Sequence, residues 1–348
     1  MASSSVLSGL TCVFGGCCTN VLSLESLIKN KESNIGLFVT FIQFIFVSLT
    51  LLPQFVTVNR FYFPRFKPLH VPIKVYLWSV LLFYISSYTN NSVFKYHISI
   101  PLHIVFRCFS VVITMIISWL VNNKRYNKLQ ILAALILTIG AIITSLYRDH
   151  DFKMEDITGL LNKEANSDLK YGRDPTFLIG LCMLVISSLS SALLSVYNEW
   201  TFKTYGKHWE ENLFYTHFLS LPIFIINDHK SIIMEYNRMF RIGSGITRNH
   251  VMLVINVLTQ NICIRGVNIL ASHTNALTLS VILTVRKFIS LLLSVIIYKS
   301  QLSFTSYIGV TIVFFGTLLY TVGSRSRKED ENSEKSGKIK ASEKSNLN

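Results

Sequence analysis

Long apolar segments constrain this chain more than any other feature of its sequence. Ten runs of about 20 residues carry almost no charge, and about 20 helical residues are needed to cross the hydrocarbon core of a bilayer. Half of the 348 residues are hydrophobic and 15% are charged, whereas a soluble domain has about 25% charged residues. We therefore predict an all-α membrane protein whose ten transmembrane helices lie at 5–27, 35–56, 72–90, 101–122, 128–147, 175–198, 208–226, 250–268, 275–298 and 303–322.

The distribution of charge orients these spans. An even number of spans places both termini on one side of the membrane, and the short loops rich in Lys and Arg favour the cytosol for that side. The formal net charge of +14 is carried mostly by loops and the C-terminal region, so it predicts contact with membrane lipid and no nucleic-acid partner. Residues 324–348 mix both charge signs with few apolar residues, which predicts a disordered cytosolic tail.

The two halves of the chain resemble each other. Arg107 in IVFRCFS corresponds to Arg286 in LTVRKFIS, and Gly140 corresponds to Gly316. Each half holds five predicted spans, so the second half enters the membrane in the opposite orientation, as in many alternating-access carriers. We predict two inverted five-helix repeats, at 1–147 and 175–323, joined by a lumenal loop at 148–174.

Two adjacent cations, Arg286 and Lys287, lie at the centre of the apolar run NALTLSVILTVRKFISLLLSVIIY. A charge at the middle of a bilayer costs roughly 2.5–3.5 kcal/mol on insertion scales. Neighbouring helical residues point about 100° apart, so we expect one of the two to line a cavity while the other faces a neighbouring helix or the cavity wall.

The predicted spans hold more cations than acids. Arg107 and Arg265 add to the central pair, although Arg265 lies near the end of its span and can equally reach the interface. Glu25 and Glu199 are the acids near the spans, so at least two cations need a partner from outside the protein. A diphosphate group is the simplest such partner, because a guanidinium binds phosphate oxygens in pairs.

Two further polar groups of residues are candidate ligand contacts. The stretch LFYTHFLSLP combines aromatic and hydrogen-bonding side chains that could stack on and read a nucleobase, although aromatic residues also form belts at membrane interfaces. The stretch NVLTQNICIRG and its neighbours could contact a ligand or form hydrogen bonds between helices. The candidate residues are Phe214, Tyr215, Thr216, His217, Gln260, Asn261 and Asn268.

No motif predicts a cofactor, a metal centre or an enzyme. The six cysteines lack CxxC spacing, and we expect them to be packing residues rather than disulfides. His and acids lie close together in KHWEEN, where a helix N-terminus favours acids, so we predict a cap there rather than a metal site. Since no P-loop, HExxH or nucleophile elbow is present, any transport must be driven by exchange or a gradient.

The chain resembles the nucleotide-sugar transporter family of the drug/metabolite transporter superfamily, in particular its yeast-type UDP-N-acetylglucosamine carriers. The stretches VFGGCCTNVLSLESL, ISIPLHIVFRCFS, YGKHWEENLFYTHFLSLP and GVNILASHTNALTLSVILTVRKFISLLLSV carry this resemblance. In relatives that carry GDP-mannose, an FYNN motif for the base corresponds to 214–217 here, and a GALNK motif corresponds to 283–287. From the second motif only Lys287 is retained, and Val285 cannot make polar contacts.

The resemblance implies a carrier, not an enzyme, in the endoplasmic reticulum or Golgi membrane. It would exchange cytosolic UDP-N-acetylglucosamine for lumenal UMP, with Lys287 and Arg286 on the phosphates. Three alternatives stay open: another UDP-sugar such as UDP-xylose, a sugar phosphate, or a non-transporting membrane scaffold. A homodimer also stays open as an assembly.

Overall fold

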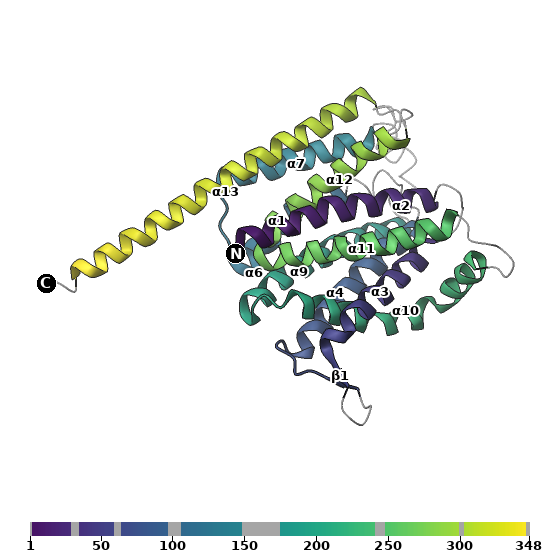
Figure 1. Ribbon diagram of the computed structural model, residues 1–348. Coiled ribbons are helices and arrows are strands. Elements are labelled where there is room, and N and C mark those ends of the chain that lie inside the picture. The colour runs from purple at the N-terminus through teal and green to yellow at the C-terminus, as the bar shows by residue number, and fades with distance from the viewer. Residues whose placement is uncertain are drawn as a thin grey trace. The chain divides into compact units, whose positions relative to one another are not determined.

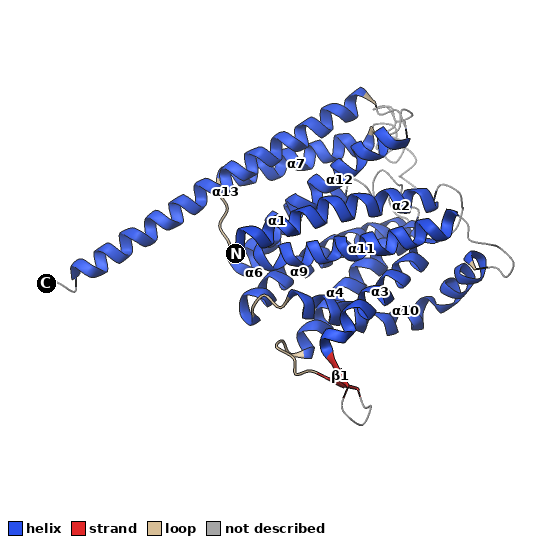
Figure 2. Cartoon of the chain, in the orientation of Figure 1, coloured by secondary structure: helices blue, strands red, loops and turns tan. Residues whose placement is uncertain are grey.

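The computed structural model describes residues 2–28, 35–58, 64–96, 106–147, 175–240, 248–298 and 303–345. These residues are mostly helical, as Figures 1 and 2 show. The long helices are α3 (Ile35–Phe55), α4 (Ile73–Ser92), α7 (Lys128–Leu146), α9 (Pro175–Tyr205), α10 (Trp209–Met239), α11 (Arg248–His273), α12 (Ala276–Tyr298) and α13 (Phe304–Ser345). Shorter elements are α1 (Ala2–Cys12), the π-helix η1 (Val13–Cys17), α2 (Cys18–Ile28), the 3₁₀ helix η2 (Val93–Tyr96) and α6 (Ser110–Asn122).

Seven helical segments among the described residues are long and apolar enough to cross a membrane. They coincide with seven of the ten predicted spans and indicate a multi-pass membrane protein. The segments are Ser4–Leu27, Gly36–Phe55, Lys128–Leu146, Leu178–Tyr205, Arg248–His273, Ala276–Ile297 and Phe304–Arg325.

The other three predicted spans also fall on helices, but these helices are shorter or more polar. Helix α6 has 13 residues, and the first residues of its predicted span lie outside the described part. Helix α4 ends in the polar stretch SSYTNNS, and α10 continues into the charged stretch NDHKSIIMEYNRM. The count of ten spans therefore stays a prediction. The predicted lumenal loop also lies outside the described residues, while α13 includes most of the predicted tail.

A small β-hairpin connects α3 to α4, which an all-α prediction does not include. Strands β1 (Val56–Val58) and β2 (Pro64–Phe66) pair antiparallel, with Val56 opposite Phe66. The β-branched sequence Val-Thr-Val suits a strand better than a helix. The hairpin brings the chain from the end of α3 towards the start of α4, and it is the red element in Figure 2.

The chain forms two compact units. Unit 1 comprises Met1–Val93 and Met183–Ser300, and unit 2 comprises Phe94–Cys182 and Gln301–Asn348. Each unit therefore combines segments from both predicted repeats.

In unit 1, the first helices pack very closely against α11. A Cβ added at Gly266 would lie 2.6 Å from Cys12 Cβ, and one at Gly16 would lie 2.8 Å from the Cys263 nitrogen. This close approach brings Cys17 within 4.6 Å of Cys263 between Cα atoms, and the two form a disulfide. The prediction that the cysteines are only packing residues is wrong for this pair, because Gly16 and Gly266 let two segments distant in the sequence approach closely.

The same helices share a buried polar network around Asn256, whose side chain is fully buried. Its Nδ2 donates to the Asn20 carbonyl and to Ser23 Oγ, both at 3.0 Å. Its Oδ1 accepts from Gln43 Nε2 at 2.6 Å, and Asn20 Nδ2 donates to the Asn256 carbonyl at 2.8 Å. Every polar atom of the Asn256 side chain is thus satisfied, which an apolar environment requires. The network connects α2, α3 and α11.

In unit 2, α7 packs lengthwise against α13, and the two run side by side in Figure 1. A Cβ added at Gly140 would lie 2.9 Å from the Gly309 carbonyl oxygen, and one at Gly316 would lie 3.0 Å from Leu137 Cγ. Small residues let two helix backbones approach closely, as is common in membrane proteins.

The contact at Gly266 predicts that Gly266→Ala destabilises the protein. The added methyl would meet Cys12 Cβ and two backbone atoms of α1 and η1, and such overpacking costs about 1–3 kcal/mol. We expect the thermal midpoint of the purified protein in detergent to fall by several degrees. Gly15→Ala is the matched control, because nothing lies within 4 Å of its added Cβ. Equal midpoints for the two variants would contradict this packing.

Candidate functional site

The two central cations of α12 lie in different environments. Arg286 is partly buried, and its Nε is buried with no hydrogen-bond partner within the described part of the chain. Lys287 is exposed. This difference in exposure agrees with the expectation that neighbouring helical residues point in different directions. A buried guanidinium nitrogen without an acceptor is energetically costly, so Arg286 is the more constrained of the two.

The two acids near the spans bind other groups. Glu25 Oε2 accepts a hydrogen bond from Ser294 Oγ at 2.6 Å, and Ser294 lies eight positions beyond Arg286, or about 12 Å along a helix. Glu199 contacts Lys203 Nζ at 2.7 Å and accepts from the Ala276 nitrogen at 2.8 Å. It therefore caps the start of α12, ten positions before Arg286. These two contacts with α12 lie eight and ten positions from Arg286.

One face of α12 leads from Arg286 to helix α2. Ser290, one turn after Arg286, donates to Cys18 Sγ at 3.2 Å, and Ser294 follows one turn later. Residues spaced by four lie on the same helix face, so Arg286 begins the line of polar residues that faces α2. The preceding residues Thr284 and Val285 are buried, and Thr284 Oγ1 donates to the Ser280 carbonyl at 2.8 Å.

The predicted base-binding cluster on α10 is packed inside unit 1. Phe214, Tyr215 and His217 are at most 8% exposed. Phe214 stacks on Phe55 with ring centroids 4.9 Å apart, and His217 lies 4.4 Å from Phe44. The neighbouring Thr216 donates to the Asn212 carbonyl at 2.6 Å. In this conformation the rings contact other aromatic side chains, and a role in base binding stays a prediction.

The polar residues of α11 lie mainly on one face. Asn261, Arg265 and Asn268 are spaced by four and three positions, and Arg265 Nε donates to Asn261 Oδ1 at 3.3 Å. Asn268 Oδ1 accepts from Asn212 Nδ2 on α10 at 3.1 Å, which is the interhelical hydrogen bonding that the sequence offered as an alternative. Gln260 is half-buried on the same helix.

Asn212 and Arg107 complete the set of polar candidates. Asn212 was not predicted: it is 4% exposed, and its Oδ1 has no hydrogen-bond partner among the described residues. Its position two residues before Phe214 is the one signal that could have identified it. Arg107 is exposed and belongs to unit 2.

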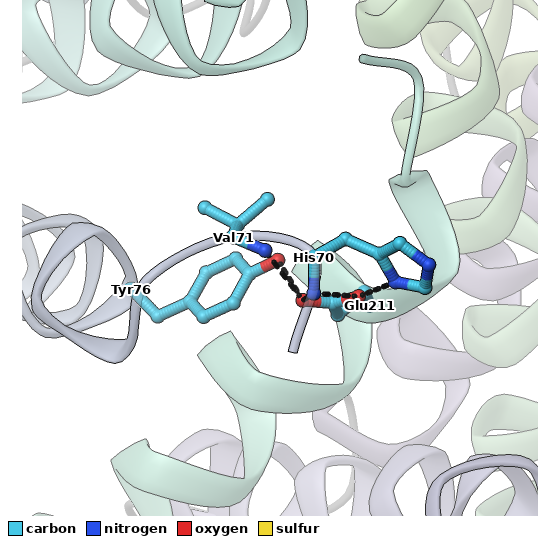
Figure 3. Close-up of polar contacts among 4 residues, drawn as sticks. All are labelled: His70, Val71, Tyr76 and Glu211. Atoms are coloured by element: carbon cyan, nitrogen blue, oxygen red, sulfur yellow. Dashed lines mark hydrogen bonds and ion pairs between the residues drawn. The ribbon is translucent and has the colours of Figure 1, made fainter. Parts of the chain in front are cut away.

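A dense polar cluster of unit 1 surrounds Glu211, which is 4% exposed (Figure 3). Its Oε1 accepts from the nitrogens of His70 and Val71 and from Tyr76 Oη, each at 3.1 Å. Its Oε2 lies 2.8 Å from His70 Nδ1. The sequence predicted that the acids of KHWEEN cap their own helix. Glu211 does lie in the first turn of α10, but its carboxylate also fixes the connection from β2 to α4.

The profile of the UAA transporter family matches residues 5–324. The UDP-N-acetylglucosamine transporter YEA4 of Saccharomyces cerevisiae is 52% identical over 95% of this chain and 99% of its own length. The UDP-xylose and UDP-N-acetylglucosamine transporter of Danio rerio is 32% identical over 91% of this chain and 94% of its own length.

A solved crystal structure with 15% sequence identity superposes with a TM-score of 0.63. It covers 93% of this chain and 98% of the solved chain. At this level of identity the similarity concerns the fold alone.

The Glu211 cluster predicts that Glu211→Gln lowers stability. Hydrogen bonds to a charged group contribute about 1.5–3 kcal/mol, and the neutral amide replaces one acceptor oxygen with a donor facing other donors. We expect a loss of about 2–3 kcal/mol, seen as a lower thermal midpoint in detergent. Glu210→Gln changes the preceding residue in the same way and serves as the control. A midpoint equal to that of the control would mean that the cluster does not stabilise the fold.

Proposed function

Because this chain belongs to the UAA transporter family, we propose that it carries UDP-N-acetylglucosamine across the endoplasmic reticulum or Golgi membrane in exchange for UMP. The substrate is supported by the name of the yeast relative, which shares 52% of its residues with this chain. The family and the relatives are named as transporters, and none of them as an enzyme.

The single observation that carries the site is the unsatisfied guanidinium of Arg286. Its Nε is buried without an acceptor among the described residues, and Glu25 and Glu199 contact α12 eight and ten positions away. A buried positive group of this kind is stabilised by an anion that enters the site. A diphosphate supplies several acceptor oxygens in the geometry that a guanidinium binds in pairs. In this proposal Arg286 and Lys287 bind the phosphates.

The same cation gives a physical reason for exchange. A carrier must close around its site to reorient, and closing around an unpaired positive group removes that group from water without compensation. Bound UDP-sugar or UMP supplies the negative charge, so the loaded carrier reorients more readily than the empty one. Differential affinity of this kind is what any ligand needs to shift a conformational equilibrium.

The proposed architecture extends the seven spans to ten. In it, 1–147 and 175–323 form two inverted five-helix repeats, 148–174 faces the lumen, and both termini and the tail 324–348 face the cytosol. Inverted repeats of carriers place the ligand near the bilayer midplane, and Arg286 lies near the middle of the span Ala276–Ile297. The cluster Phe214–His217 would hold the base. The carrier could act as a monomer or as a homodimer.

UDP-xylose is a second candidate substrate. The zebrafish relative is named for both UDP-xylose and UDP-N-acetylglucosamine, and the two sugars share the same nucleotide part. An uptake panel across UDP-sugars separates these candidates from each other. Competition by free UMP separates both from a sugar-phosphate carrier, which would not respond to it.

Exchange predicts faster uptake into vesicles that contain UMP. We expect purified protein in proteoliposomes to accumulate labelled UDP-N-acetylglucosamine several-fold faster with internal UMP than with buffer alone, because the loaded carrier returns more readily. Vesicles loaded with inorganic phosphate control for unspecific anion effects. Equal rates with and without internal UMP would disprove obligatory exchange while leaving transport itself intact.

The proposed role of Arg286 in binding phosphate predicts that Arg286→Gln weakens uptake of the UDP-sugar. Losing hydrogen bonds from a charged group costs about 1.5–3 kcal/mol, so uptake below saturation should fall about 10- to 100-fold. Arg286→Lys keeps the charge and should retain part of the activity. Arg65→Gln, on the exposed hairpin, is the matched control. Full activity of Arg286→Gln in protein that folds normally would remove this residue from the site.

A further inference from the structure

Three metal-ligating side chains of unit 1 converge beside α10. His70 lies in the connection from β2 to α4, His208 immediately precedes α10, and Glu211 lies in its first turn. Each offers one ligand atom, and these atoms all lie within 4.8 Å of one another. We propose that His70, His208 and Glu211 form a binding site for a divalent transition metal ion, with Zn²⁺ as the fitting ion. This inference is independent of the proposed transport function.

The two imidazoles lie next to each other beside the carboxylate, and rotation of one ring would direct both towards a single ion. The rings of His70 and His208 stack with centroids 4.2 Å apart and an angle of 17° between their planes. Within the described part of the chain, no hydrogen-bond partner is found for either ring nitrogen of His208, although this residue is half-buried. Two imidazoles beside a buried carboxylate provide the nitrogen and oxygen donors that Zn²⁺ accepts.

The ligand atoms would have to shift to reach coordination distances, because they now lie within 4.8 Å of one another. Zinc binds His nitrogen at about 2.0–2.1 Å and carboxylate oxygen at about 2.0–2.2 Å, so two ligands of a tetrahedral ion lie about 3.3–3.5 Å apart. His70 Nδ1 and Glu211 Oε2 are 2.8 Å apart, so the ion would replace their hydrogen bond and separate them slightly. The His70 side chain is 64% exposed and can rotate to accommodate it. A fourth position would remain open to water.

The surroundings already orient the carboxylate. Tyr76 Oη and the nitrogen of Val71 both bind Glu211 Oε1. Figure 3 shows these contacts on one side of the carboxylate and the His70 ring on the other. Outer partners of this kind fix a ligand's orientation and raise the affinity of a metal site. Oε2 accepts from the His70 nitrogen at 3.3 Å and would bind the ion in place of His70 Nδ1. The ion would tie the β2–α4 connection to the start of α10.

The test is zinc binding by the full-length protein in detergent after chelator treatment. Addition of zinc chloride at about 50 µM should raise the thermal midpoint of the wild type by about 3–8 °C, since a ligand that binds only the folded state stabilises it. His229→Ala, which removes an exposed histidine elsewhere on α10, should show the same rise. His70→Ala and His208→Ala should lose most of it, and Mg²⁺ should have little effect because it prefers oxygen ligands.

Bound zinc per chain, measured by elemental analysis after desalting, gives a second readout that does not depend on stability. We expect about one zinc per wild-type chain and a clear loss in His70→Gln and His208→Gln, which change half-buried or exposed residues and should leave the fold intact. An unchanged midpoint and no bound zinc in the wild type would overturn the site. Equal zinc binding by the wild type and both variants would overturn it as well.

Discussion

Low water content inside a helical membrane bundle forces every buried polar group to find a partner within the protein or in a ligand. Around Asn256 this requirement is met completely, since both atoms of its amide side chain are bound by α2 and α3. At Arg286 it is not met among the described residues. The first arrangement connects α2, α3 and α11 within unit 1, whereas the second leaves Arg286 Nε without a hydrogen-bond partner in the described part of the chain. Arg286 Nε is an unsatisfied atom that belongs to a cation at the centre of an apolar helix, and this combination marks the proposed site.

Local patterns in the sequence were sufficient to locate helices, but they did not reveal which residues of different helices contact each other. Apolar runs located seven spans because length and hydropathy are properties of one segment. The Cys17–Cys263 disulfide and the contact from His70 to Glu211 connect residues far apart in the chain. No pattern in KHWEEN or CVFGGCC reveals such a partner. Arg286 could be identified as a candidate because a charge inside an apolar run is a local signal. No signal of that strength marked the buried Asn212, which contacts α11.

Helix α10 carries both the Glu211 cluster and the aromatic residues proposed to bind the base. Its first turn carries Glu211, which fixes the β2–α4 connection, and its next turn carries the aromatic residues Phe214 and Tyr215. These aromatic rings pack against Phe55 and Tyr76, so the hairpin region, the start of α4 and the proposed base-binding cluster form one continuous core. A base can stack there only if one of these aromatic contacts opens. Access to the cluster therefore depends on the helices that flank α10 as much as on α10 itself.

The α12 sequence also limits how the sugar can be recognised. In relatives that carry GDP-mannose, the ligand-binding motif GALNK corresponds to residues 283–287 of this chain, which include Thr284 and Val285. Here both are buried, and the Thr284 hydroxyl already binds the Ser280 carbonyl. An apolar isopropyl group offers no hydrogen bond to a sugar hydroxyl. Another polar surface in unit 1 is the half-buried face of Asn261, Arg265 and Asn268, which offers donors and acceptors that Thr284 and Val285 do not provide in this conformation.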